Sequence, residues 1–317
     1  MDNIDKNILE CYFENGRISI KALARRINSP QATVHYRIER LKKQGIILPR
    51  SIPLINYPLL GYPSCYLFLI RTQRSQTIPK LPSTVVVTKL SYSGYWDEGI
   101  LVFTALSLQE CILIFRTIFK EDLLELENVH LQTISFYSLV LSKRFVKKIV
   151  AQYIIPPPKV IELTLIQKKI LSAISTDGSI ALWEIALKLR ISPQRARYHL
   201  LELMKNKTLL QIRPQLNITK SLAILLVKLH FADKKSFDNL IAWAKKESCV
   251  NACGFGLGKY NVLIQIFYEN TLDIVQVIDS LKKTIAENLH LLDLLLCTKE
   301  EVVANSEPLY LPASGTK

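Results

Sequence analysis

The chain has 317 residues, of which 49% are hydrophobic and 21% are charged, and its formal net charge at pH 7 is +14. This length is too great for one ordinary hydrophobic core and is typical of two to four domains. No apolar run approaches the roughly 18 to 20 residues of a membrane-spanning helix, and the acidic start of the chain is unlike a signal peptide. We therefore expect a cytoplasmic protein that buries some apolar surface between subunits.

One segment of the chain occurs twice, 162 positions apart. Residues 15–24 match residues 177–186, and the register continues without a gap through Leu41 and Leu203. Apolar positions match apolar positions while surface positions vary, which is typical of a duplicated unit. Each copy would hold a small helical module followed by about a hundred residues of mixed strand and helix.

Positive charge is concentrated in the two helical modules. Residues 17–50 carry nine Lys or Arg and one acidic residue, a net charge of +8. Residues 179–213 carry seven basic and two acidic residues, a net charge of +5. Such a concentration is typical of proteins that bind a polyanion, and double-stranded DNA is the partner that we expect.

The first module reads as three short helices. Apolar spacing predicts a helix over residues 5–13, and Gly16 lies just beyond its end. Ser19 is a suitable N-cap for a second helix. Ser29 and Pro30 predict the start of a third helix, with Ser as the cap and Pro at the first helical position. A wing strand would follow, so this order predicts a winged helix-turn-helix.

The third helix divides into a core face and an outer face. At 100° per residue, Val34, Ile38 and Leu41 lie in one narrow stripe and should face the core. The opposite face is polar and basic, as on a helix that enters the major groove, although a merely solvated charged face is the alternative. Polar side chains would reach base edges and the cations would hold phosphates. The residues that we predict to contact DNA are Arg25, Arg26, Gln31, Thr33, His35, Tyr36, Arg37, Arg40 and Lys43.

The second module follows the same plan with a third helix at residues 193–206. Ala181 replaces the capping Ser19, and Leu201 replaces Glu39 on the outer face. This module either binds DNA less well or only packs, and the sequence leaves both open. Its predicted DNA contacts are Gln194, Arg195, Arg197, Tyr198 and His199.

A β-α-β-β-α-β pattern follows each module and predicts a ferredoxin-like sheet with helices on one face. In the first copy we expect strands at residues 64–72, 85–91, 99–105 and 131–141 and a helix at 107–119, while Pro79 and Pro82 interrupt the other helix. In the second copy we expect strands at 222–231, 250–256, 260–268 and 289–298 and helices at 236–246 and 272–286. The fold class is therefore α+β. The expected domains are winged helices at 1–50 and 159–214, ferredoxin-like domains at 51–150 and 215–302, and a tail at 303–317.

The six cysteines are scattered along the chain. Cys249 and Cys253 lack a second pair of ligands at zinc-finger spacing. Buried free thiols are the expected state, and we predict neither a metal nor another cofactor.

The first module has a distinctive set of residues: Asp5, Ile8, Leu9, Asn15, Gly16, Arg17, Ile18, Ser19, Leu23, Ala24, Arg25, Arg26, Ile27, Ser29, Pro30, Val34, Arg37, Ile38, Arg40, Leu41, Gly45, Ile46 and Ile47. In these residues the chain resembles the Lrp/AsnC (leucine-responsive, feast–famine) transcription regulators. The sheet modules resemble that family's regulation-of-amino-acid-metabolism domain. Its Gly-x-Tyr-Asp turn is matched by residues 258–261 and, with Trp96 in place of Tyr, by residues 94–97.

This resemblance implies a sequence-specific DNA-binding transcription regulator. Family members dimerise through the sheet domain, which implies a homo-oligomer, and often bind a small effector, usually an amino acid. The residues implied in effector binding are Gly94, Trp96, Asp97, Gly258, Tyr260 and Asn261. The chain departs from the usual plan because it is a tandem fusion, so we expect its two sheet modules to pair as two subunits would.

Two other functions are open. Siroheme decarboxylases share the plan of winged helix plus sheet domain, but their chemistry needs His or Arg groups around a tetrapyrrole. The histidines here are dispersed and no nucleophile–base set is evident, so we do not expect an enzyme. The other alternative is a partner subunit that does not bind DNA, which the charge of the first module disfavours. The histidines are His35, His130, His199, His230 and His290.

Overall fold

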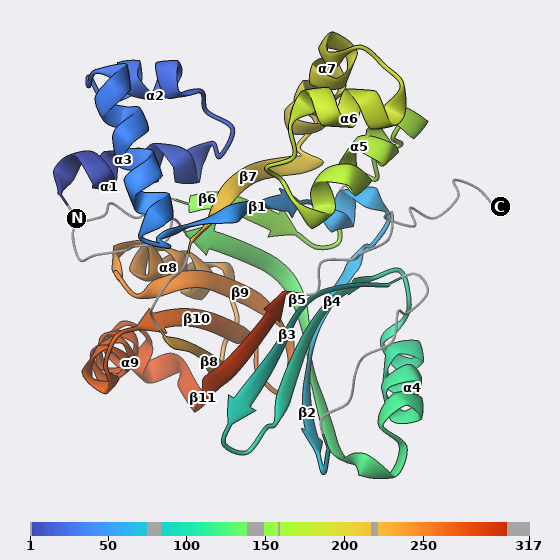
Figure 1. The fold of residues 1–317 in the computed structure, drawn as a ribbon. Helices are drawn as coiled ribbons and strands as arrows, with labels where there is room; N and C mark the ends of the chain where they lie inside the picture. Colours follow the sequence, from blue (N-terminus) through green and yellow to red (C-terminus); the bar gives the residue numbers. More distant parts are fainter. Residues whose placement is uncertain (1, 75–83, 138–148, 158, 217–220, 303–317) are drawn as a thin grey trace. The chain divides into compact units, whose positions relative to one another are not determined.

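The computed structural model describes residues 2–74, 84–137, 149–157, 159–216 and 221–302 (Figure 1). The chain forms two compact units. The winged-helix unit contains Met1–Asn56 and Ile161–Ile218, and the sheet unit contains Tyr57–Val160 and Thr219–Ala304. Within the part of the chain that is described, no helix is long and apolar enough to cross a membrane.

The winged-helix unit holds two modules with the same order of three helices and one strand. Most of the predicted helices are confirmed, with ends that differ by a few residues. The first module comprises α1 (Asn3–Glu14), α2 (Ile20–Arg26), α3 (Gln31–Lys43) and β1 (Ile47–Ile55). The second comprises α5 (Leu165–Thr176), α6 (Leu182–Leu189), α7 (Pro193–Lys205) and β7 (Leu209–Leu216).

Side-chain caps mark the starts of α2 and α7 but not that of α3. Ser19 accepts a hydrogen bond from the Ala22 backbone N–H, as predicted for α2. The prediction for α3 is wrong, because Pro30 itself is the N-cap, in an extended conformation, and no side chain caps the helix. In the second module, Ser192 does cap α7 and Pro193 occupies its first turn.

The wing strands of the two modules pair with each other. β1 and β7 form an antiparallel two-stranded ribbon, although the sequence indicated a separate wing for each module. The backbone N–H of Gly16 donates to Ile212 O at 2.7 Å, and that of Gly178 donates to Ser51 O at 2.8 Å. The guanidinium of Arg17 also donates to Gly178 O at 2.7 Å. The two winged helices are therefore joined by backbone hydrogen bonds as well as by a ribbon.

The sheet unit also holds two modules. The first comprises β2 (Ser64–Thr72), β3 (Thr84–Ser93), β4 (Glu98–Thr104), α4 (Leu108–Phe119) and β5 (Leu123–Tyr137), preceded by a 3-10 turn, η1 (Tyr57–Leu60), and followed by β6 (Ile149–Ile154). The second comprises β8 (Ser221–Leu229), α8 (Lys234–Lys246), β9 (Val250–Gly258), β10 (Val262–Tyr268), α9 (Thr271–Ile285) and β11 (Leu289–Val302). Short 3-10 turns, η2 (Lys120–Asp122) and η3 (Ala286–Asn288), lead into β5 and β11.

Several strand ends differ from the prediction by a few residues, and the start of β5 differs most. β5 begins at Leu123 rather than at Leu131, because residues 123–131 pair along β2. The end of the predicted strand, beyond Tyr137, and the segment around Pro79 and Pro82 lie outside the described residues.

The eight strands of the two modules close into a ring of hydrogen-bonded neighbours. Each module has the ferredoxin-like order, β5-β2-β4-β3 in the first and β11-β8-β10-β9 in the second. The fourth strand of each module pairs with the second strand of the other, as β5 with β9 and as β11 with β3. These two joins are equivalent, so the modules pair as the subunits of a symmetric dimer would.

The helices of each module cover a sheet face and bury apolar side chains there. In the first module Phe115 of α4 packs with Phe68 and Ile100. In the second, Leu240 of α8 and Leu281 of α9 belong to the same buried cluster as Leu225. Burial on this scale is the main favourable term in folding such a unit.

The join of β5 with β9 can be tested at Gly256. A Cβ atom on Gly256 would lie 2.3 Å from the backbone oxygen of His130, whereas one on Gly254 would meet the flexible Leu131 side chain at 3.2 Å. We expect Gly256→Ala to lower the free energy of unfolding by about 1–3 kcal/mol through overpacking. Gly254→Ala is the matched control and should change it much less. Urea unfolding followed by tryptophan fluorescence measures both, and equal effects would contradict the join.

Candidate nucleic-acid interface

The third helix of the first module presents a polar outer face. Val34, Ile38 and Leu41 are fully buried, which confirms the predicted core face. Tyr36 is 64% exposed on the opposite side. The other exposed residues of α3 are Gln31, Ala32, His35, Lys42 and Lys43, and Thr33 is half-buried.

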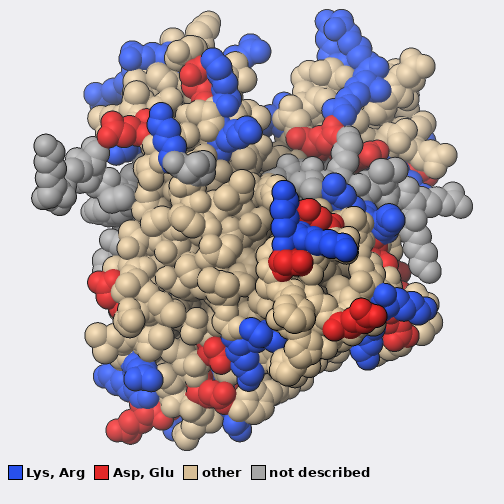
Figure 2. Space-filling view, turned by 180° about the vertical axis from the view of Figure 1, so that it is seen from behind, with Lys and Arg blue, Asp and Glu red and all other residues tan. Residues whose placement is uncertain are grey.

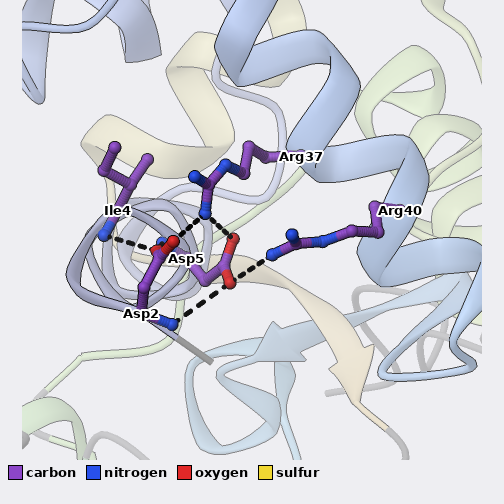
Figure 3. Close-up of polar contacts among 5 residues, drawn as sticks. All are labelled: Asp2, Ile4, Asp5, Arg37 and Arg40. Carbon is purple, nitrogen blue, oxygen red and sulfur yellow. Dashed lines mark hydrogen bonds and ion pairs between the residues drawn. The ribbon is translucent and has the colours of Figure 1, made fainter.

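Two arginines of α3 point toward α1 instead of outward (Figure 3). Nη2 of Arg40 donates to Oδ2 of Asp5 at 2.5 Å, and Nη1 of Arg37 donates to Oδ1 of Asp5 at 3.2 Å. Arg37 also pairs with Asp2, and this pair holds the pKa of Asp2 at about 2, well below its ordinary value. Arg40, which helical spacing placed on the outer face, therefore reaches back across the helix to Asp5, and its contact with DNA stays a prediction.

The Asp5 carboxylate is the centre of this cluster. Its side chain is only 1% exposed, while the side chains of Arg37 and Arg40 are 19% and 35% exposed. A buried carboxylate needs paired donors, since an unpaired one is strongly unfavourable. The cluster thus fixes the angle between the first helix and the recognition helix of this module.

Other cations remain at the surface around α2 and α3. Arg25, Lys43 and Arg50 are exposed, and Arg26 is exposed although it pairs with Glu14 of α1. Lys and Arg side chains are spread over the winged-helix unit (Figure 2). Exposed Lys and Arg side chains are the groups that commonly bind phosphates, and these phosphate contacts stay a prediction.

The second module presents a different outer face. Gln194, Arg195, Arg197 and Tyr198 are exposed on α7, as predicted, but His199 is half-buried. Large apolar side chains are exposed on α6 and α7. The sequence prediction named only one of them, Leu201, as part of an outer face. Their spacing of three or four residues was the available signal. These residues are Trp183, Leu187, Leu201 and Met204.

The two turns implied in effector binding have matching backbone geometry. Gly94 and Gly258 have φ of +143° and +138°, a region open to glycine. The Asp97 carboxylate accepts from the Thr72 N–H at 2.8 Å, and Oδ1 of the Asn261 side chain accepts from the Leu229 N–H at 2.8 Å. The Asn261 amide also donates to Leu229 O at 3.1 Å, which a carboxylate could not do. Both side chains are thus committed to holding a strand end.

The aromatic residues of these turns lie in the interior of the sheet unit. Trp96 is 2% exposed and Tyr260 is 1% exposed. The Tyr260 hydroxyl donates to the Asp293 carboxylate, and burial followed by this hydrogen bond raises the pKa of Tyr260. Neither ring faces solvent, so an effector role for Trp96 and Tyr260 stays a prediction of the family resemblance.

Not all histidines are as dispersed as the sequence indicated. The rings of His230 and His290 lie 4.6 Å apart, and His130 lies 4.7 Å from the ring of Tyr66. In the described residues, no three His, Cys, Asp or Glu side chains gather as a metal site would require. The six cysteines are free thiols.

Comparisons with known proteins identify a DNA-binding winged helix in the first module. The family described as winged helix-turn-helix DNA-binding matches residues 1–47. An uncharacterised HTH-type transcriptional regulator of Pyrococcus horikoshii is 34% identical over 106 residues, covering 31% of this chain and 69% of the relative. The regulatory protein AsnC of Escherichia coli is 31% identical over 97 residues, which cover 29% of this chain and 63% of AsnC. The chain belongs to the Lrp/AsnC family of HTH-type transcription regulators.

A solved structure matches this Lrp/AsnC chain over almost its whole length. The crystal structure of the siroheme decarboxylase NirDL has a TM-score of 0.62 and covers 94% of this chain and 92% of its own. The two sequences are 16% identical, so the likeness concerns the fold alone.

The Asp5 cluster should matter to stability more than a surface ion pair of the same helix does. We expect Asp5→Asn to lower the free energy of unfolding by about 1–3 kcal/mol, because two guanidinium groups lose a buried carboxylate. Glu39→Gln is the control, since the exposed Glu39–Lys42 pair should contribute less than about 0.5 kcal/mol. Urea titration of the two variants provides the comparison, and equal losses would show that burial of Asp5 is unimportant.

Proposed function

We propose that this regulator recognises its operator through the first winged helix. The observation that carries the proposal is the polar outer face of α3, where Tyr36 is exposed opposite a fully buried stripe. In a winged helix-turn-helix of three short helices, the helix that carries such a face is the one that docks in the major groove.

Within this proposal the side chains have distinct roles. Gln31, His35 and Tyr36 are exposed on the first two turns of α3 and would contact base edges. Arg25 and Lys43, with Arg26 and Arg50 beside them, would bind phosphates. Arg37 and Arg40 act as positioning residues, because Asp5 already engages both. A homo-oligomer and a small effector, such as an amino acid, stay predictions of the family resemblance.

Tyr36 and its counterpart Tyr198 give a matched test of which module recognises DNA. Both rings are exposed, 64% and 60%, so neither substitution should disturb the fold. We expect Tyr36→Ala to weaken binding to a duplex selected from a random library by about 5- to 150-fold, as for the loss of one base contact. Tyr198→Ala should have little effect. Fluorescence anisotropy with full-length protein measures both affinities.

The salt dependence of the same titrations separates phosphate contacts from base contacts. Lys43→Ala should reduce the slope of log K against log salt by about one and weaken all sequences alike. If Tyr198→Ala abolished binding while Tyr36→Ala left it unchanged, the second module would be the one that recognises the DNA sequence. Absence of any complex at low salt would overturn the DNA-binding proposal.

A second candidate function is tetrapyrrole chemistry, which the fold match with NirDL across 94% of the chain favours. Under the regulator proposal, siroheme added to the purified protein should keep its free absorption spectrum and release no carbon dioxide. A saturable shift of the Soret band, followed by loss of carboxylate groups, would replace the regulator proposal with the enzyme.

A further inference from the structure

The outer surface of the second winged helix is apolar where that of the first is charged. In the register of 162 positions, Trp183 and Leu187 of α6 stand where α2 has Lys21 and Arg25. In the same register, the apolar Leu201 and Met204 of α7 replace the charged Glu39 and Lys42 of α3.

The apolar side chains form two pairs at helical spacing. Trp183 and Leu187 are four residues apart on α6 and are 61% and 72% exposed. Leu201 and Met204 are three residues apart on α7, and both are exposed. Residues at these spacings share one face of a helix. Each helix therefore carries an apolar stripe on its outer face, while Ile185 of α6 and Leu203 of α7 form the inner side.

DNA is a poor partner for this surface. Phosphates need cationic or hydrogen-bonding groups, and large apolar side chains supply neither. Exposed apolar side chains in such number are typical of protein–protein contact sites. In the first module, by contrast, Tyr36 is the one large apolar residue exposed among those whose burial is described.

The charges around the stripes indicate the chemistry of the partner. Lys188, Arg190, Arg195, Arg197 and Lys205 are all exposed on or beside α6 and α7. Two copies of this surface would bring like charges together, which disfavours pairing with a second copy. A partner with apolar side chains set among carboxylates would be complementary in both respects.

We propose that this surface docks an acidic amphipathic segment of another protein, with α6 and α7 receiving its apolar side chains. The first winged helix then contacts DNA while the second recruits a protein. This assignment does not depend on whether the first module binds DNA, because it rests on α6 and α7 alone.

The test uses the full chain and a designed peptide. The probe is a fluorescein-labelled helix of about 20 residues with Leu at every third or fourth position and Glu elsewhere. A peptide of the same composition, scrambled to remove the apolar stripe, is its control. We expect the striped peptide to bind about tenfold more tightly or better, by fluorescence anisotropy.

Substitutions in the chain assign the peptide to this surface. Trp183→Lys with Leu187→Arg installs the residues of the first module and should weaken peptide binding about tenfold or more. Leu272→Lys changes another exposed leucine, on α9, and should leave the affinity for the peptide unchanged. Circular dichroism checks that both variants fold, and a Leu201→Glu variant repeats the test on α7 alone.

Three outcomes would overturn the proposal. The scrambled peptide could bind equally well, or a Lys-for-Glu version of the probe could bind as tightly as the acidic one. Alternatively, sedimentation velocity could show self-association of the wild type that Trp183→Lys with Leu187→Arg abolishes, which would make a second copy the occupant.

Discussion

Backbone hydrogen bonding between equivalent strands is the constraint on which this molecule depends. β1 of the first winged helix pairs with β7 of the second, and β3 and β5 pair with β11 and β9. An unpaired strand edge presents a row of donors and acceptors that invites other chains. Here each module covers the edge of its counterpart, so the two modules of one chain supply to each other what the subunits of a symmetric dimer would.

Each module can change on its outer surface as long as the contacts that it shares with the other module remain. The contacts that hold strand ends persist with changed chemistry, because Asp97 and Asn261 both offer an oxygen to a backbone N–H. Helix starts persist similarly, through a capping box at Asp2 and another at Thr164. The outer faces show the opposite behaviour, since Trp183 stands where the first module has Lys21.

Much of this architecture could be predicted from sequence because it rests on local periodicity. Helical spacing predicted the buried stripe of α3, and a continuous apolar run predicted β2 to the residue. The pairing of β1 with β7 could not be predicted, since no local pattern specifies a partner more than 150 residues away. The start of β5 was missed because the prediction followed continuous apolar runs, whereas residues 123–130 mix apolar and polar side chains as a strand with one exposed face does.

The candidate interface was predicted less well, for a reason particular to long side chains. Backbone geometry placed Arg40 on the outer side of α3, but a guanidinium can reach a carboxylate across several ångströms of helix surface. The turns around Trp96 and Tyr260 were predicted to bind an effector, yet the rings of both residues are interior. The turn motif could be found in the sequence, whereas the burial of Trp96 and Tyr260 follows from tertiary packing.

The Asp5 cluster explains why the two outer faces could diverge in different directions. In the first module a buried carboxylate holds two arginines, so removing either arginine would take one of two ion-pair partners from a buried charge. The counterparts in the second module are Gln167, His199 and Glu202, of which Gln167 is committed to capping α5. There Ala196, Leu200 and Leu203 bury the inner side of α7 by apolar packing. Apolar packing is insensitive to charge on the opposite face, so the second module could exchange charged surface residues for apolar ones without loss of its fold.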